Sequence, residues 1–266
     1  MLELINLKTE FLIGDRYMTA VNDVSLTVEK GKTVGLVGES GSGKSVTSLS
    51  TLRLLPNNAR CSGKILWKSQ DLKTASESTM RAIRGREIAM IFQNPLAALN
   101  PVFTIANQMI ETIMLHHPVT KEVAREKAIQ LLDRVKIPNP KERINDYPHQ
   151  FSLGMCQRIM IAITLAMKPD LIIADEPTAS LDVTVQTQIM ALLNELQEEH
   201  DMSMLLISHD LGVIAQNCDY IYIMYHGNIV EEGPTYDIFK HPKNAYTQAL
   251  IAAIPSIEPP KKENLR

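Results

Sequence analysis

The residues best suited to chemistry lie in two segments that are far apart in the chain. One is a glycine-rich loop, Gly38-Glu-Ser-Gly-Ser-Gly-Lys44-Ser45, and the other is the carboxylate pair Asp175 and Glu176. Glycines let backbone N–H groups wrap around phosphates, and a lysine in such a loop contacts the β- and γ-phosphates. Adjacent carboxylates can hold magnesium and polarise an attacking water. The two segments together predict hydrolysis of a nucleoside triphosphate.

The loop follows an apolar run, Val34–Val37, and precedes a helical pattern. This context favours a phosphate site, because a helix N-terminus attracts anions. Ser45 is predicted to bind Mg²⁺ through its hydroxyl, and Lys44 to contact the phosphates. The strand, the helix and the later carboxylates disfavour a plain glycine-rich turn with an exposed lysine. The predicted nucleotide-binding residues of the loop are Gly38, Glu39, Ser40, Gly41, Ser42, Gly43, Lys44, Ser45 and Val46.

Asp175 ends another apolar run, Leu171–Ala174, and is predicted to hold Mg²⁺ directly or through water. Glu176 is predicted to polarise the water for in-line attack. Two carboxylates so close together repel each other unless a cation lies between them. Without the loop upstream, the pair would equally well begin a solvated loop.

Two further polar residues follow apolar runs, Gln93 after Ile88–Ile91 and His209 after Met204–Ile207. Parallel strands present their carboxyl ends to one edge, where ligands bind. The amide of Gln93 is therefore predicted to reach the magnesium or the water, and His209 to hydrogen-bond the γ-phosphate and orient Glu176 or the water. A lone histidine in a loop would otherwise be an ordinary polar residue.

The elements that must position these residues predict an α/β fold with a parallel-sheet core, formed by the four apolar runs. Helical stripes separate the runs, one of them after Thr120, a predicted N-cap. Residues 1–29 alternate and predict an antiparallel β subdomain, with a turn at Asn22-Asp23. Prolines punctuate helical patterns between Ile91 and Leu171, which predicts an inserted helical subdomain.

We therefore expect one domain over 1–266, a length ample for a large core. Its predicted parts are a core with the antiparallel strands at 1–93 and 169–240, the helical subdomain at 94–168, and a C-terminal helix and tail at 241–266. The end of the tail, 255–266, is expected to be extended.

The composition of the chain indicates which partners it has and where in the cell it works. A net charge of −3 gives no basic footprint, so nucleic acid is not expected as a partner. The N-terminus lacks a signal-peptide pattern and no apolar run reaches the roughly 18 residues of a membrane span, so we expect a cytoplasmic chain that works at a membrane only through partner subunits. Cys61, Cys156 and Cys218 are widely spaced and are expected to be ordinary thiols.

Over nearly the whole chain, these residues resemble the nucleotide-binding subunit of ABC transporters. The loop resembles the Walker A motif, and residues 171–176 resemble the Walker B motif with its catalytic glutamate. Gln93 falls at the position of the Q-loop, and His209 at the position of the switch histidine. Asp182 ends a segment, Ser180-Leu-Asp, that resembles the D-loop. The resemblance implies a P-loop NTPase fold with ATP and Mg²⁺ as cofactors. The segments 92–101, 179–186 and 246–255 look like the peptide and nickel importer branch.

The resemblance further implies a head-to-tail pair of ATPase subunits, in which each ATP lies between the Walker A of one and the signature motif of the other. Two transmembrane permeases and, indirectly, an external solute-binding protein would complete the transporter, with this chain at the cytoplasmic face of the membrane. In this family an aromatic residue upstream of Walker A stacks on adenine. Phe11 is the preferred residue and Tyr17 the second choice, although either could be an ordinary core aromatic.

The signature motif departs from the family pattern Leu-Ser-Gly-Gly-Gln, since this chain has Phe151-Ser-Leu-Gly-Met155. Ser152 and Gly154 can still offer a hydroxyl and a backbone N–H to a phosphate. Leu153, in place of the first glycine, could obstruct the phosphate and would disfavour a left-handed backbone. We hypothesise that the chain pairs with a different ATPase subunit, whose own ATP site is weakened by this leucine.

Import of an oligopeptide or dipeptide is the leading interpretation, and nickel or another metal complex is the alternative. The family's cysteine-rich extension does not follow in this sequence, which gives no support for an iron–sulfur cluster and weakens a firm peptide assignment. A non-transport ABC ATPase that regulates a soluble complex, and a catalytically poor structural subunit, are further alternatives. Intact Lys44, Asp175, Glu176 and His209 argue against the structural subunit.

Overall fold

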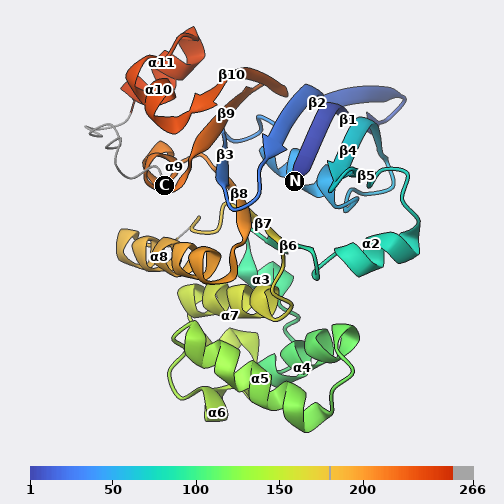
Figure 1. The fold of residues 1–266 in the computed structure, drawn as a ribbon, viewed down its shortest axis with the longest axis vertical. Coiled ribbons are helices and arrows are strands. Elements are labelled where there is room, and N and C mark those ends of the chain that lie inside the picture. Colours follow the sequence, from blue (N-terminus) through green and yellow to red (C-terminus); the bar gives the residue numbers. More distant parts are fainter. Residues whose placement is uncertain (180, 254–266) are drawn as a thin grey trace. The chain divides into compact units, whose positions relative to one another are not determined.

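The computed structural model describes residues 1–179 and 181–253. The chain forms two compact units, one made of Met1–Arg81 with Asp201–Arg266 and the other of Ala82–His200 (Figure 1). Helix α2 (Glu77–Ile83) spans the boundary between them. None of the helices in the described part of the chain is long and apolar enough to cross a bilayer.

The first unit contains an antiparallel sheet with the strand order β2-β1-β4-β5. Its strands are β1 (Leu2–Ile13), β2 (Arg16–Val28), β4 (Ala59–Trp67) and β5 (Gln70–Asp71). Buried and exposed residues alternate over much of β1 and β2, as expected of strands with one face on a core. The predicted antiparallel strands before the phosphate loop are present.

The predicted turn at Asn22-Asp23 is wrong. The chain reverses at Gly14, whose φ is +60°, and Asp23 lies inside β2 with a φ of +55°. Two residues of β2 stand opposite one residue of β1 between the pairs Leu7↔Val24 and Thr9↔Val21, which is a β-bulge. Asp23 accepts a hydrogen bond of 2.6 Å from Asn6 Nδ2, which ties the bulge to β1.

The same unit also holds β3 (Thr33–Val37), which pairs in parallel with both β8 (Ser203–Ser208) and β9 (Tyr220–Tyr225). Every residue of β3 is buried. Strand β10 (Asn228–Pro234) adds antiparallel to β9. Besides α2, the described residues of this unit form the helices α1 (Lys44–Thr51), α9 (Leu211–Asn217), α10 (Thr235–Lys240) and α11 (Ala245–Ala252).

The second unit has two short parallel strands, β6 (Ile88–Ile91) and β7 (Leu171–Asp175), paired from Ile88↔Leu171 onward. All four predicted apolar runs are thus strands with parallel partners. Between β6 and β7 every described element is helical, in the order α3 (Pro95–Ala98), α4 (Ile105–His116), α5 (Lys121–Arg134), α6 (Pro140–Arg143), a 3₁₀ turn (Pro148–Gln150) and α7 (Leu153–Leu165). Helix α8 (Val183–His200) ends the unit.

Local sequence explains where these helices begin and which faces they bury. The predicted N-cap Thr120 accepts a hydrogen bond from the Val123 N–H, and the stripe residues Ala128, Leu132 and Val135 are fully buried. In Figure 1, α4, α5 and α6 gather beside α7. The subdomain boundaries 94–168 stay a prediction, and the tail at 255–266 lies outside the described residues.

Candidate functional site

The phosphate loop connects β3 to α1, and only glycine fits at its two ends. A Cβ on Gly38 would lie 2.1 Å from the backbone oxygen of Met224. Gly43, with a φ of +111°, is the N-cap of α1, and a Cβ there would lie 2.6 Å from the Ala20 oxygen. Because Gly38 and Gly43 have no Cβ, the loop packs tightly against β2 and β9, and a larger residue at either position would clash with the backbone of these strands.

Polar groups inside the loop fit a phosphate. Lys44 is 4 % exposed, and its Nζ donates to the carbonyl oxygens of Gly38 at 2.7 Å and Glu39 at 2.8 Å. The buried hydroxyl of Ser42 has no hydrogen-bond partner among residues 1–179 and 181–253. Buried polar groups are normally satisfied. A phosphate held at the start of α1 would supply an acceptor for Ser42 and a counter-charge for Lys44.

The two candidates for adenine stacking both lie in the antiparallel sheet. Phe11 is half-buried in β1, opposite Met18 of β2. Tyr17 is 45 % exposed, and the guanidinium carbon of Arg60 lies 3.5 Å from its ring centroid. Because Arg60 covers one face of the Tyr17 ring, the arrangement favours Phe11, whose role stays a prediction.

The last site residue predicted in this unit is His209. It is exposed and follows β8 directly, at the end of the strand that pairs with β3. The next residue, Asp210, caps α9 through hydrogen bonds from the Gly212 and Val213 N–H groups. The backbone around His209 is therefore fixed by β8 on one side and by a capped helix on the other.

In the second unit, Gln93 and Glu176 meet at the carboxyl ends of β6 and β7. Gln93 Nε2 donates a hydrogen bond of 2.8 Å to Glu176 Oε2. Asp175 is the last residue of β7 and is 5 % exposed. Glu176 has a φ of +48°, a left-handed conformation that non-glycine residues adopt at a cost. The structure thus brings Glu176, the predicted water-polarising carboxylate, together with Gln93, whose amide is predicted to reach the magnesium or the water.

The predicted magnesium ligands come from both units, since Ser45 belongs to the first, and Gln93 and Asp175 to the second. Their hydroxyl, amide and carboxylate oxygens suit Mg²⁺. Their joint coordination stays a prediction. Asp182 accepts a hydrogen bond of 2.9 Å from the Val185 N–H at the start of α8, while Ser180 of the D-loop lies outside the described residues.

The signature motif forms the start of α7. Ser152 is the N-cap, and its Oγ accepts a hydrogen bond of 3.3 Å from the Met155 N–H. The same hydroxyl can also donate a hydrogen bond, so its predicted contact with a phosphate stays a prediction. Leu153 is the first helical residue and has no positive φ, so the left-handed conformation that we expected it to disfavour does not occur. A Cβ on Gly154 would lie 2.9 Å from Val185 Cγ1, which explains glycine at that position.

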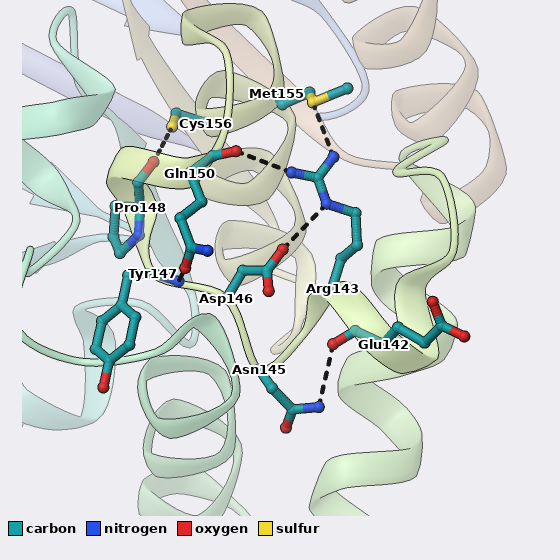
Figure 2. A network of polar contacts seen from close by, with 9 residues as sticks. All are labelled: Glu142, Arg143, Asn145, Asp146, Tyr147, Pro148, Gln150, Met155 and Cys156. Carbon is teal, nitrogen blue, oxygen red and sulfur yellow. Dashed lines mark hydrogen bonds and ion pairs between the residues drawn. The ribbon is translucent and has the colours of Figure 1, made fainter.

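Arg143, at the end of α6, was missed by sequence reasoning, and it braces the signature segment (Figure 2). Its guanidinium donates to Asp146 at 3.2 Å, to the Gln150 carbonyl at 3.0 Å and to the Met155 sulfur at 3.5 Å. It also lies 4.2 Å from the centroid of the Phe151 ring. One planar side chain therefore holds the segment from several directions, as the rigid arginine fork allows.

The cysteine beside this network is structural. Cys156 Sγ donates to the Pro148 carbonyl at 3.4 Å, as Figure 2 shows, and burial raises the pKa of this thiol. All three cysteines are free thiols, as predicted. Cys156 helps to join the 3₁₀ turn to α7 and is not a reactive group.

Comparisons with known proteins agree with this geometry. A family model described as "ABC transporter" matches residues 21–179, and one described as "Oligopeptide/dipeptide transporter, C-terminal region" matches residues 230–266. A putative peptide import ATP-binding protein of Brucella abortus is 50% identical over 97% of this chain and 78% of its own length. The dipeptide transport ATP-binding protein DppD of Bacillus subtilis is 46% identical over 95% of this chain and 76% of its own.

Solved structures with the same fold include an ATP-binding cassette and a protein from an ABC transporter complex. The ATP-binding cassette MJ0796, solved as a dimer bound to ADP and Pi, superposes with a TM-score of 0.78 at 26% identity over 88% of this chain and 98% of its own. The cbiO1 protein of Clostridium perfringens, part of an ABC transporter complex, gives a TM-score of 0.75 at 24% identity over 90% of each chain. The predicted fold class is confirmed.

Proposed function

The chain belongs to the ABC transporter family and is one of its ATP-hydrolysing cassettes, and we propose that it powers peptide import through membrane permeases. Peptide as the cargo is supported by the match of residues 230–266 and by the names of the relatives. Those names do not favour nickel or another metal complex. The observation that most supports its role in hydrolysis is the Gln93–Glu176 hydrogen bond, because it fixes a carboxylate at the edge where ligands bind.

Some of the site residues hold ATP, and others activate the attacking water. Lys44 and the N–H groups of the loop bind the phosphates, and His209 hydrogen-bonds the γ-phosphate. Glu176, whose Oε2 accepts the hydrogen bond from the Gln93 amide, accepts the proton of the attacking water. Mg²⁺, held by Ser45, Gln93 and Asp175, would supply charge neutralisation of the phosphate oxygens.

We further propose that two ATPase subunits close head to tail, so that Ser152 and Gly154 contact the ATP held by the partner's loop. The dimeric solved structure of a related cassette supports this arrangement. The partner is proposed to be a different subunit, because Leu153 makes this chain's signature unlike the family pattern. We also propose that the chain works with two permeases and, indirectly, with an external solute-binding protein. It would lie at the cytoplasmic face of the membrane.

Arg143→Lys is expected to lower ATP turnover of the assembled transporter by about 3- to 10-fold, a loss equivalent to one or two hydrogen bonds. Lysine keeps the charge but cannot span Asp146, Gln150 and Met155 at once. ATP binding by the isolated variant should stay normal, since its own loop is untouched. Arg125→Lys, which alters an arginine that donates a hydrogen bond to Asn145 in the same unit, is the control. Equal turnover in the two variants would contradict the role of Arg143.

Leu153→Gly is expected to raise the ATP affinity or the turnover rate of the reconstituted complex by about 3-fold or more, if the leucine obstructs the partner's γ-phosphate. The gain should appear at the partner's site, so it should persist when this chain's own loop carries Lys44→Met. No gain in rate or affinity would count against obstruction.

The proposed cargo can be tested by the ATPase rate of the complex reconstituted with its permeases and solute-binding protein. Addition of peptides is expected to stimulate hydrolysis several-fold, whereas nickel is not. Stimulation of hydrolysis by nickel and not by peptides would contradict peptide as the cargo and would indicate nickel instead. Purification of the chain with a soluble complex and without membrane proteins would favour a non-transport ABC ATPase instead.

A further inference from the structure

The side chain of Tyr246, on helix α11, contacts the phosphate loop. The Tyr246 hydroxyl accepts a hydrogen bond of 3.2 Å from the Glu39 N–H. That N–H belongs to the peptide group joining Gly38 to Glu39, whose carbonyl accepts from Lys44 Nζ at 2.7 Å. The same peptide group is thus held from both ends, by Tyr246 through its hydrogen and by Lys44 through its oxygen.

Tyr246 is held in place independently of its hydroxyl. Its ring packs on Tyr225 at the end of β9, with ring centroids 4.2 Å apart and planes at 35°. The Tyr246 N–H donates to the Asn244 side chain at 2.8 Å, which caps α11. Removal of the hydroxyl alone would therefore leave the ring in position.

The turn before α11 is anchored to β10 by a carboxylate. Glu231 accepts hydrogen bonds from the N–H groups of Lys243 at 2.7 Å and Asn244 at 3.0 Å. The Asn244 amide also donates to the Val230 carbonyl at 3.3 Å. These contacts fix the start of α11, so the Tyr246 hydroxyl approaches the loop from a rigid support.

We propose that Tyr246 is a positioning residue for ATP, which fixes the Gly38–Glu39 peptide and, through it, Lys44 in the conformation that binds phosphate. The proposal rests on the ATP-binding role of the loop and extends it to a residue within the C-terminal region matched at 230–266. Without the hydroxyl, the Glu39 N–H loses its protein partner and the loop can sample other conformations. Apparent affinity falls in proportion to the fraction of molecules that remain competent to bind.

Tyr246→Phe is expected to raise the Kd of the purified full chain for Mg-ATP by about 2- to 10-fold, which is the effect of one lost hydrogen bond. In the assembled transporter, the KM for ATP should rise by a similar factor while kcat stays unchanged. A residue that only supported folding would lower the melting temperature without this split between KM and kcat.

Tyr236→Phe is the matched control, because Tyr236 lies on the neighbouring helix α10 and its hydroxyl accepts a hydrogen bond of 2.6 Å from Lys240. The change removes one phenolic hydroxyl from the same C-terminal segment and should leave the Kd for ATP unaltered. An unaltered Kd in Tyr246→Phe, or a weakening that Tyr236→Phe shares, would overturn the proposal. A wild-type chain that does not bind ATP would overturn the proposed function as well, which separates the two failures.

Discussion

Glu176→Gln is expected to lower the ATP turnover of the assembled transporter by about 10²- to 10⁴-fold while leaving ATP bound, because an amide cannot accept the proton of the attacking water. The replacement keeps the shape of the side chain, and its carbonyl oxygen can still accept the hydrogen bond of 2.8 Å from Gln93. The loss should therefore fall on kcat rather than on ATP affinity. Retention of radiolabelled ATP after gel filtration would show the trapped state.

Glu126→Gln is the control for this variant, since Glu126 is an exposed carboxylate on α5 in the same unit. It should hydrolyse ATP at the wild-type rate. Turnover of Glu176→Gln within a few fold of this control would show that another group accepts the proton.

Lys44→Met is expected to weaken ATP binding by about 10- to 100-fold, the loss of a charge-assisted contact to phosphate. Methionine preserves much of the apolar stem in a site where Lys44 is 4 % exposed. It also leaves the carbonyls of Gly38 and Glu39 without the ammonium that now bonds both of them. The loop should therefore lose its bound conformation as well as its charge.

The Kd of a fluorescent ATP analogue for the isolated chain measures this effect directly. Lys64→Met is the matched control, because Lys64 is an exposed lysine on β4 of the same unit. If Lys44→Met bound ATP as tightly as Lys64→Met, the phosphate site would have to lie elsewhere in the chain.

The core strands could be predicted because burial on both faces requires continuous apolar runs. Val34–Val37 and Leu171–Ala174 each became a strand with a parallel partner. The bulge at Asn22 and Asp23 could not be predicted, since the left-handed backbone of Asp23 is common to turns and bulges alike. What decides between them is the pairing with β1, including the hydrogen bond from Asn6, and such pairing is not encoded locally.

In the site, too, features set by local sequence could be predicted, whereas contacts between distant residues could not. The placement of Gln93 and Glu176 at one edge was foreseeable, because both residues follow strands whose carboxyl ends share an edge, but the hydrogen bond between them was not predicted. The roles of Arg143 and Tyr246 were not, because no spacing links Arg143 to Met155 or Tyr246 to Glu39 before the chain folds. The conformation of Leu153 depended on where α7 begins, and Ser152 as N-cap settles that point.

Uptake of a labelled peptide into proteoliposomes tests whether ATP hydrolysis by this chain drives peptide transport. The vesicles would contain the chain with its partner ATPase and permeases, and a solute-binding protein would present the peptide. Accumulation should require ATP on the side where the chain lies and should fall to background with Glu176→Gln. Peptide accumulation without ATP, or at the wild-type rate with Glu176→Gln, would show that ATP hydrolysis by this chain does not drive transport.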